Sequence, residues 1–247
     1  MKRWGLLAIG LGIYALALIA TAPAALVDTH LQAASDGRLR LAEAQGTLWS
    51  GTGQLEIRDA RGRSGLAKRV AWRLLPGALL RARLAYEVEL DPGSRPFPVT
   101  IFWSRLDIAN ADIRLPAVAL GHVVPKLAAL GLTGDMNLQI PTLSIGRDTA
   151  RGSATVQWHA AGSALSPISP LGNYELRIMG EGGTVRTTLH TLQGPLQLDG
   201  QGVWGNGRKP EFLATARMPP QLQQRLAPFL RLIAVERGDG SFELRLK

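Results

Sequence analysis

The strict alternation of apolar and polar residues constrains the fold of this chain more than any other feature. In residues 84–90 the apolar side chains occupy every second position, and Glu87 and Glu89 lie between them. Successive residues of a strand point to opposite faces of a sheet, so this pattern is typical of a strand with one buried and one solvated face. Comparable alternation recurs at residues 70–74, 154–158, 174–178 and 242–246.

Turn-forming residues separate these short strands at regular intervals. The chain contains 28 glycines and 15 prolines, and many of them cluster between the alternating segments, as at 91–93, 181–183 and 205–207. Many short strands divided by such turns are typical of antiparallel sheet proteins. We therefore expect an all-β domain, built as a curved antiparallel sheet or as a sandwich.

Two segments have helical rather than strand periodicity. Apolar residues recur at spacings of three and four in residues 116–131 and 219–234, as on the buried face of a helix. Proline is tolerated in the first turn of a helix but not in its interior, so Pro220 suits a helix start and Pro228 predicts a kink. We expect these segments to form one or two short helices that cap the ends of the sheet.

The chain also carries a weak internal repeat. Residues 46–72 combine strand glycines with two tryptophans, and residues 194–204 repeat the pattern and end in Trp204. Glycine inside a strand usually marks a bulge, a bend or a close backbone approach. Two similar lobes, 40–158 and 159–247, are therefore one candidate arrangement, and a single continuous sheet is the other.

Residues 4–27 contain no charged side chain, and two cations precede them. A helix needs about 20 apolar residues to cross a bilayer core of about 30 Å, and flanking cations favour the cytoplasmic side. The pattern predicts a cytoplasmic tail at 1–3, a transmembrane anchor at 4–27 and a periplasmic domain at 28–247. The alternative is a cleaved secretory signal, because the small residues at 21–25 resemble a cleavage site. Both interpretations export residues 28–247.

The composition excludes several classes of chemistry. The chain has no cysteine, so thiol catalysis, cysteine metal sites and disulfides are all excluded. Its net charge is +9, but the cations are dispersed and aromatic residues make up only 6 %. This argues against a nucleic-acid surface, which interleaves cations with aromatic rings, and favours membrane headgroups or acidic proteins as partners. The four histidines show no metal-ligand spacing: His30, His122, His159 and His190.

Catalytic motifs are absent as well. No glycine-rich loop is followed by the Lys-Ser/Thr pair of a phosphate-binding site, and there is no G-x-S-x-G nucleophile motif. Glu87 and Glu89 lie on the wet face of one predicted strand, so we interpret them as solvated rather than catalytic. We therefore predict a protein without enzymatic activity, cofactor, metal or small-molecule substrate.

Large aromatic residues stand out in a chain with so few of them. Trp49, Trp72, Trp158 and Trp204 all lie in or beside predicted strands. Tryptophan most often fills a core, but it is also enriched at binding interfaces. These four residues are the candidate core or interface residues of the domain.

An ordered set of motifs follows the uncharged stretch. Gly46-Thr47-Leu48-Trp49-Ser50-Gly51 comes first, Trp72-Arg73-Leu74-Leu75-Pro76 second and Pro170-Leu171-Gly172-Asn173-Tyr174 third. In this order, and over nearly the whole chain, the sequence resembles the protein N family of the type II secretion system. The resemblance implies an inner-membrane protein with a single membrane-spanning helix, no enzymatic activity and no catalytic residues.

Two functional hypotheses remain open at this point. In the first, which the resemblance implies, the chain assists the export of folded proteins across the outer membrane. It would do so through contacts with the inner-membrane platform of the secretion system and with its outer-membrane secretin. In the second, the chain is an envelope lipid-handling protein, whose curved sheet leaves an apolar face open.

Overall fold

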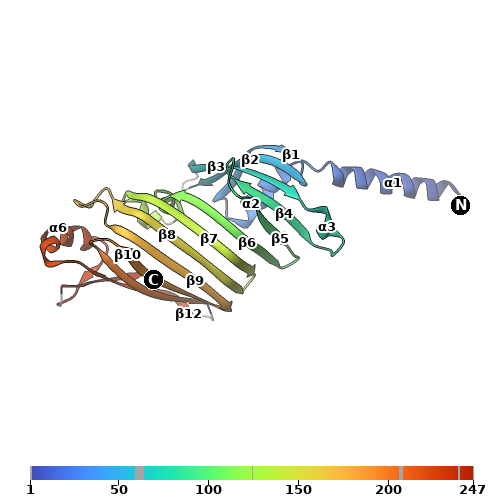
Figure 1. Ribbon diagram of the computed structural model, residues 1–247. Coiled ribbons are helices and arrows are strands. Elements are labelled where there is room, and N and C mark those ends of the chain that lie inside the picture. The colour runs from blue at the N-terminus through green and yellow to red at the C-terminus, as the bar shows by residue number, and fades with distance from the viewer. Residues whose placement is uncertain (1, 59–63, 124, 206–207, 239, 247) are drawn as a thin grey trace.

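The computed structural model describes residues 2–58, 64–123, 125–205, 208–238 and 240–246 (Figure 1). The helices are α1 (Lys2–Ala20), α2 (Ala25–Ala34), α3 (Pro76–Leu79), α4 (Ala119–Val123), α5 (Pro125–Ala128) and α6 (Pro220–Leu230). The strands are β1 (Leu39–Gly46), β2 (Ser50–Arg58), β3 (Ser64–Leu74), β4 (Leu84–Leu90), β5 (Phe97–Ile101), β6 (Arg105–Pro116), β7 (Leu132–Gly146), β8 (Ala150–Ser163), β9 (Gly172–Gly182), β10 (Thr184–Gln193), β11 (Gln197–Gly205), β12 (Arg208–Arg217), β13 (Val235–Glu236) and β14 (Phe242–Leu246). The turn expected at 205–207 lies partly outside the described residues.

The described strands form one antiparallel sheet of fourteen strands. From β1 to β12, each strand pairs with the next one in the sequence, because short connections return the chain alongside itself. The order changes only after α6, where β14 lies beside β12 and the two-residue β13 lies outside it. The all-β antiparallel prediction is confirmed, in the form of a single sheet rather than a sandwich.

The pairing register keeps the apolar residues on one face across the whole sheet. From β8 to β12, Ala154, Ile178, Thr187, Gly202 and Phe212 are successive partners. Directly paired residues point to the same side of a sheet, so the alternation within each strand becomes a continuous surface across strands. We call this surface the apolar face and the opposite one the polar face.

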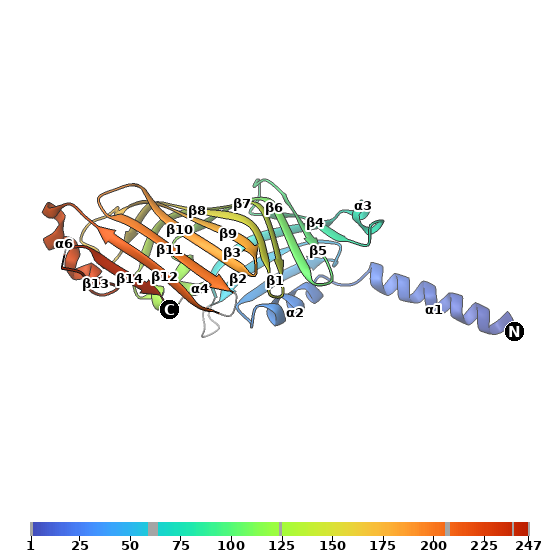
Figure 2. The same cartoon turned by 90° about the horizontal axis from the view of Figure 1, so that it is seen from below.

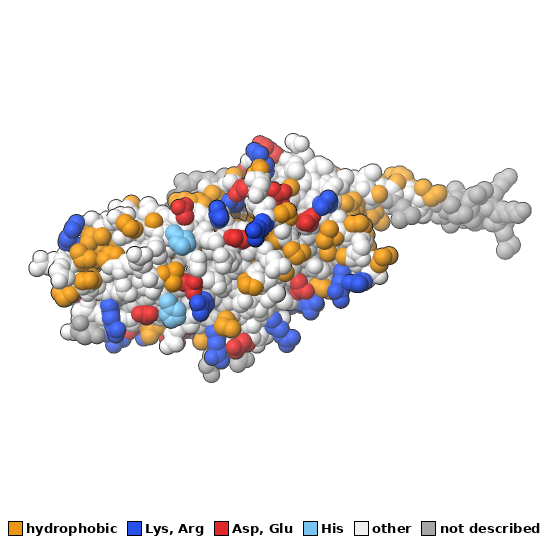
Figure 3. All heavy atoms as spheres, viewed as in Figure 1, with side chains coloured by type: hydrophobic (Ala, Val, Ile, Leu, Met, Phe, Trp, Pro, Cys, Tyr) orange, Lys and Arg blue, Asp and Glu red, His pale blue; other side chains and the backbone are white. Residues whose placement is uncertain are grey.

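The sheet bends into a half-pipe (Figures 1 and 2). The middle strands β7 and β8 lie at the crest of the bend, while the strands at both ends curl back. Helices α2 and α4 lie on the hollow side. The view in Figure 3 is onto the outer side, where charged side chains of both signs are spread among hydrophobic ones. The bend follows from the twist that large sheets accumulate, which makes them curl.

Helices cover the two ends of the apolar face. At the first end, Val27 and Leu31 of α2 pack on a buried cluster that includes Trp72. At the other end, Leu226 and Leu230 of α6 are almost fully buried, in a cluster completed by strand residues. The expected helices at 116–131 and 219–234 are thus observed as α4 with α5 and as α6.

The central part of the apolar face is different. Its buried members are Phe97, Ala111, Ile140 and Ala154, each from a different strand. Every described residue of this cluster, including the partly buried ones packed around it, belongs to a strand. The described residues of this cluster therefore come from strands alone, although α4 also lies on the hollow side of the sheet.

Helix α1 stands apart from the sheet and projects from the end where β1 lies (Figure 1). It ends at Ala20, earlier than the expected residue 27. Pro23 cannot continue a helix because it lacks the amide hydrogen, and Ala24 is buried against the sheet. Within the part of the chain that is described, no helix has both the length and the apolar character needed to span a membrane.

The boundary between the two expected lobes falls inside one strand. Residues 158 and 159 both belong to β8, which pairs with β7 on one side and β9 on the other. The sheet is therefore continuous where the lobes were expected to divide. Similarity between the two halves stays a prediction.

Candidate functional site

The Gly46-to-Gly51 motif forms the joint between α1 and the sheet. The chain turns here from β1 into β2, and Trp49 Nε1 donates a hydrogen bond to Ile19 O at 2.8 Å. Leu48 N donates to Ala22 O at 2.8 Å, and Ala24 N donates to Gly46 O at 3.2 Å. Three hydrogen bonds therefore connect the end of α1 and the segment after it to the turn between β1 and β2.

The side chain of Trp72 stabilises this joint from the apolar face. Its side chain is 9 % exposed, and its Nε1 donates to Thr47 O at 3.3 Å and to Leu48 O at 3.2 Å. The neighbouring strand carries Gly51, where a Cβ atom would lie 2.6 Å from the Trp72 ring. Glycine is required there because the indole fills the space a side chain would take. This contact explains why the Gly46-to-Gly51 motif contains a glycine and the Trp72-to-Pro76 motif begins with a tryptophan.

The other two candidate tryptophans lie on the apolar face, far along the sheet from the joint. Trp158 of β8 donates from Nε1 to Thr133 O at 2.9 Å, and its ring lies 6.1 Å from that of Tyr174. Trp204 of β11 stacks on Phe212 with ring centroids 6.2 Å apart. The structure does not bring the four tryptophans into one site. Their role at an interface stays a prediction.

The tendency of tryptophan to fill a core also predicts a buried position for Trp103, and this prediction is wrong. Trp103 lies in the turn between β5 and β6, and its side chain is fully exposed. The neighbouring Phe102 ring lies between two guanidinium groups, 5.3 Å from Arg83 and 4.3 Å from Arg105. The sequence signal for exposure is the position of Phe102 and Trp103 in a hairpin turn, where no core position is available.

The two carboxylates of β4 on the polar face, Glu87 and Glu89, each make one local contact. Glu87, on the wet face of β4 as expected, forms an ion pair with Arg73 of β3 at 2.6 Å. Glu89 accepts a hydrogen bond from Gly93 N at 2.8 Å. Both contacts are structural, and neither carboxylate faces a second acid across a cleft, as glycoside hydrolysis requires.

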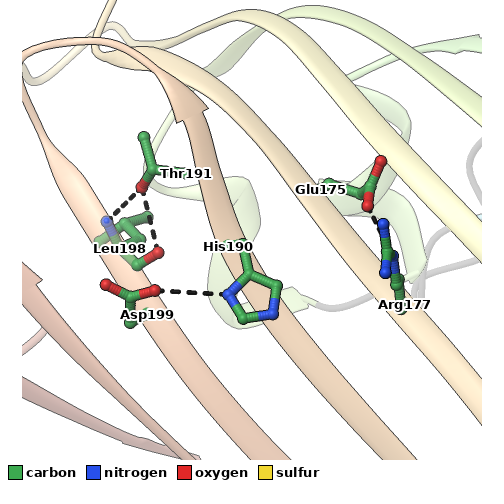
Figure 4. A network of polar contacts seen from close by, with 6 residues as sticks. All are labelled: Glu175, Arg177, His190, Thr191, Leu198 and Asp199. Carbon is green, nitrogen blue, oxygen red and sulfur yellow. Dashed lines mark hydrogen bonds and ion pairs between the residues drawn. The ribbon is translucent and has the colours of Figure 1, made fainter.

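A small polar network lies on β9, β10 and β11 (Figure 4). Arg177 Nε donates to Glu175 Oε1 at 2.7 Å, and His190 Nδ1 lies 3.4 Å from Asp199 Oδ1. The pKa of Glu175 is lowered, chiefly because the Gln157 side chain donates to its carboxylate at 2.9 Å, with Arg177 adding to the effect. These contacts stabilise the charged form of a nearly buried carboxylate.

The described residues contain no group of three or more His, Asp or Glu side chains that would hold a metal ion. The side chain of His122 lies outside the described part. Burial raises the pKa of the Tyr174 hydroxyl, which donates to Leu196 O at 3.0 Å and is thereby held neutral.

One cavity combines charge with apolar surface. It measures about 560 Å³ and lies between β3, the turn after β4 and the second half of β6. The cations Lys68, Arg95 and Arg114 line it together with Leu90 and Ile113, which also contact the central apolar cluster. Two carboxylates share the lining, Asp112 and the Lys68 partner Asp91.

A family model described as type II secretion system (T2SS), protein N matches residues 37–245, which run from just before β1 into β14. No curated protein and no solved structure matches the chain. The family resemblance seen in the sequence motifs is confirmed.

We predict that Trp72→Ala lowers the free energy of unfolding by about 3–5 kcal/mol, because it empties a buried space and leaves two carbonyls without their donor. Trp103→Ala is the matched control and should change it by less than about 0.5 kcal/mol, since that ring is exposed. Chemical denaturation of both variants measures the difference. Equal stability of the two variants would contradict a core role for Trp72.

Glu175→Gln should destabilise the protein at neutral pH but not in acid. Since folding lowers the pKa of Glu175, its contribution is fully present above the unfolded value of about 4.3 and is lost as the pH falls through the folded value. Thermal melts at pH 7 and pH 3 test this, with the exposed Glu181→Gln as control. A deficit of equal size at both pH values would rule out a role for the charge.

Proposed function

Because the chain belongs to the type II secretion system protein N family, we propose that it is a non-enzymatic component of that system. In this role it assists the export of folded proteins across the outer membrane by contacting other proteins of the machine. The observation that carries the proposal is the family match, which spans the sheet from β1 to β14. Family membership indicates a role in type II secretion, and the contact-based mechanism is our inference from the fold.

The proposal includes an anchor in the inner membrane. Helix α1 carries two cations at its start and no charge from residue 4 onward. Its described side chains Leu11, Ile13 and Leu18 are more than half exposed, which is costly in water and favourable in lipid. Residues 28–247 then lie in the periplasm, following the charge rule for short tails.

The end of the sheet opposite α1 is the candidate surface for protein contacts. Leu232 and Val235, which follow α6, are 67 % and 72 % exposed. They line an open cavity of about 590 Å³ together with charged residues of β14. Since β13 pairs with only two residues of β14, the rest of that strand also has an edge without a strand partner in the described chain. Exposed apolar residues beside an open edge favour docking by strand addition.

A second candidate function, lipid handling, is favoured by the central apolar face. This surface is built from strand residues alone, and many of its side chains are only partly buried. Most strands are hydrogen-bonded to a neighbouring strand on both sides. The backbone beneath these side chains is therefore already hydrogen-bonded, and a hydrocarbon ligand on this face does not have to supply hydrogen bonds to it. The 560 Å³ cavity beside it is lined by Arg95 and Arg114, which suit an anionic headgroup, together with Asp91 and Asp112. An acyl chain is the occupant that this chemistry fits.

Secretion in a strain lacking the protein tests the first function. The parent chain and Met179→Asp, an exposed position on the polar side of β9, should restore secreted enzyme to the medium. The double variant Leu232→Asp/Val235→Asp should fail to do so because charge disrupts the apolar docking surface. Circular dichroism of both purified variants controls for folding. Full rescue by the double variant would exclude this end of the sheet.

Lipid content tests the second function with neighbouring residues on opposite faces. Ile178→Asp places a charge on the central apolar face, whereas Met179→Asp places it on the polar face. Mass spectrometry of the gently purified full-length protein should find phospholipid with the parent and with Met179→Asp, and far less with Ile178→Asp. If all three carry the same amount, the lipid is bound around α1, and the apolar face has no part in it.

A further inference from the structure

An exposed apolar surface lies where two neighbouring turns meet. One is α3 with the turn that follows it, where Leu80 is 92 % exposed, and the other is the β5–β6 turn with the fully exposed Trp103. The turns are adjacent because Leu84 pairs with Ile101 across β4 and β5. We call this surface the tip patch; it comprises Leu79, Leu80, Leu84, Ile101 and Trp103, all more than a third exposed.

Cations, and no acids, are interspersed in the tip patch. Arg81 and Arg83 lie beside Leu80, and Arg105 follows Trp103. Residues 75–84 and 101–106 contain no Asp or Glu. Among the described residues, neither Arg81 nor Arg83 takes part in a salt bridge; Arg83 instead lies over the Phe102 ring. Arg105 is paired with Asp107 at 3.0 Å, so Arg81 and Arg83 supply the unneutralised positive charge that the patch presents together with leucine and tryptophan.

The joint holds this patch next to the end of α1. Trp49 Nε1 donates to Ile19 O in α1, and the backbone oxygen of Trp49 accepts from Leu74 N at 2.6 Å, two residues before α3 begins. A single residue thus connects the end of α1 with the start of α3. Figures 1 and 2 both show α3 at the end of the sheet from which α1 projects.

We propose that the tip patch docks on the anionic headgroup surface of the membrane that holds α1. Tryptophan and leucine mixed with arginine is the composition of a membrane–water interface, where the rings enter the headgroup region and the cations meet lipid phosphates. The short connection through Trp49 keeps the patch close to the bilayer surface whenever α1 is inserted. The inference rests on the proposed anchoring of α1, and it adds a second contact that fixes the tilt of the sheet relative to the membrane.

A membrane is favoured over a protein as the occupant by position and charge. A protein partner can be recognised anywhere on the sheet, whereas only this end is tied to α1. Residues 75–84 and 101–106 carry no carboxylate to pair with cations of a partner, and the guanidinium groups of Arg81 and Arg83 complement a surface of phosphates. The same pairing of exposed apolar side chains with an α1 connection does not occur at Leu232, on the opposite end.

The absence of cysteine from the chain allows a clean labelling experiment. Three full-length variants, Leu11→Cys in α1, Leu80→Cys in the tip patch and Leu232→Cys at the far end, carry an environment-sensitive NBD fluorophore. Each is reconstituted into vesicles of phosphatidylglycerol and phosphatidylcholine and compared with the same protein in detergent. We expect the labels at positions 11 and 80 to report an apolar environment protected from aqueous quencher, and the label at 232 to stay in water.

The dependence of label protection on charge distinguishes docking on lipid headgroups from a label that merely lies close to the membrane. Replacing Arg81 and Arg83 by Glu in the Leu80→Cys chain should remove most of the protection at position 80, as should vesicles of phosphatidylcholine alone. The label at position 11 should be unaffected by either change. High salt should act in the same direction, since it shortens the Debye length from about 10 Å at 0.1 M to about 3 Å at 1 M.

The outcomes distinguish this inference from the anchoring on which it rests. If the label at position 11 stays in water, the proposed anchor fails, and the docking inference fails with it. If position 11 enters lipid while position 80 remains as accessible as position 232, the anchor stands and the docking inference is overturned. Protection of position 80 that requires added secretion-system proteins would also overturn it, in favour of a protein interface.

Discussion

The whole structure depends on one constraint, which is that directly paired residues in adjacent strands point to the same side of a sheet. Because the strands pair in sequence order, a local alternation in each strand becomes one apolar face from β1 to β14. That face must be shielded from water, and the bend of the sheet together with α2 and α6 accomplishes this at its two ends. The described residues of the central cluster are all strand residues, and α4 also lies on the hollow side.

The second organising feature is the joint around Trp49 and Trp72. An indole N–H seeks an acceptor, and here the acceptors are backbone oxygens at the end of α1 and in the turn that enters β2. Because the joint is short, whatever surface holds α1 also determines where the sheet begins. The proposed membrane anchor, the tip patch and the proposed distal docking surface therefore lie along one molecule in a defined order.

Much of the fold was predictable because polarity alternation is a local signal. The strand at 84–90 and the helix at 219–234 were both expected, since each displays its periodicity within a few residues. The irregularity at Asn110 in β6 was not expected. Ile108 and Ala111 lie three residues apart, and simple alternation would place them on opposite faces, yet both join the central cluster. Asn110 between them has φ of 51°, which resets the alternation, and only its tertiary surroundings reveal that.

By itself the sequence determined the all-β class, the polarity of each strand face, the uncharged stretch of residues 4–27 and the family, because each is encoded in neighbouring residues or in an ordered set of motifs. Tertiary structure decided what depends on curvature and on contacts between distant segments. It left Trp103 in water and buried Trp72, although both are tryptophans beside a strand end, because one occupies a hairpin turn and the other a paired strand on the apolar face. Whether a large aromatic residue stabilises a core or is free to meet a partner depends on that placement.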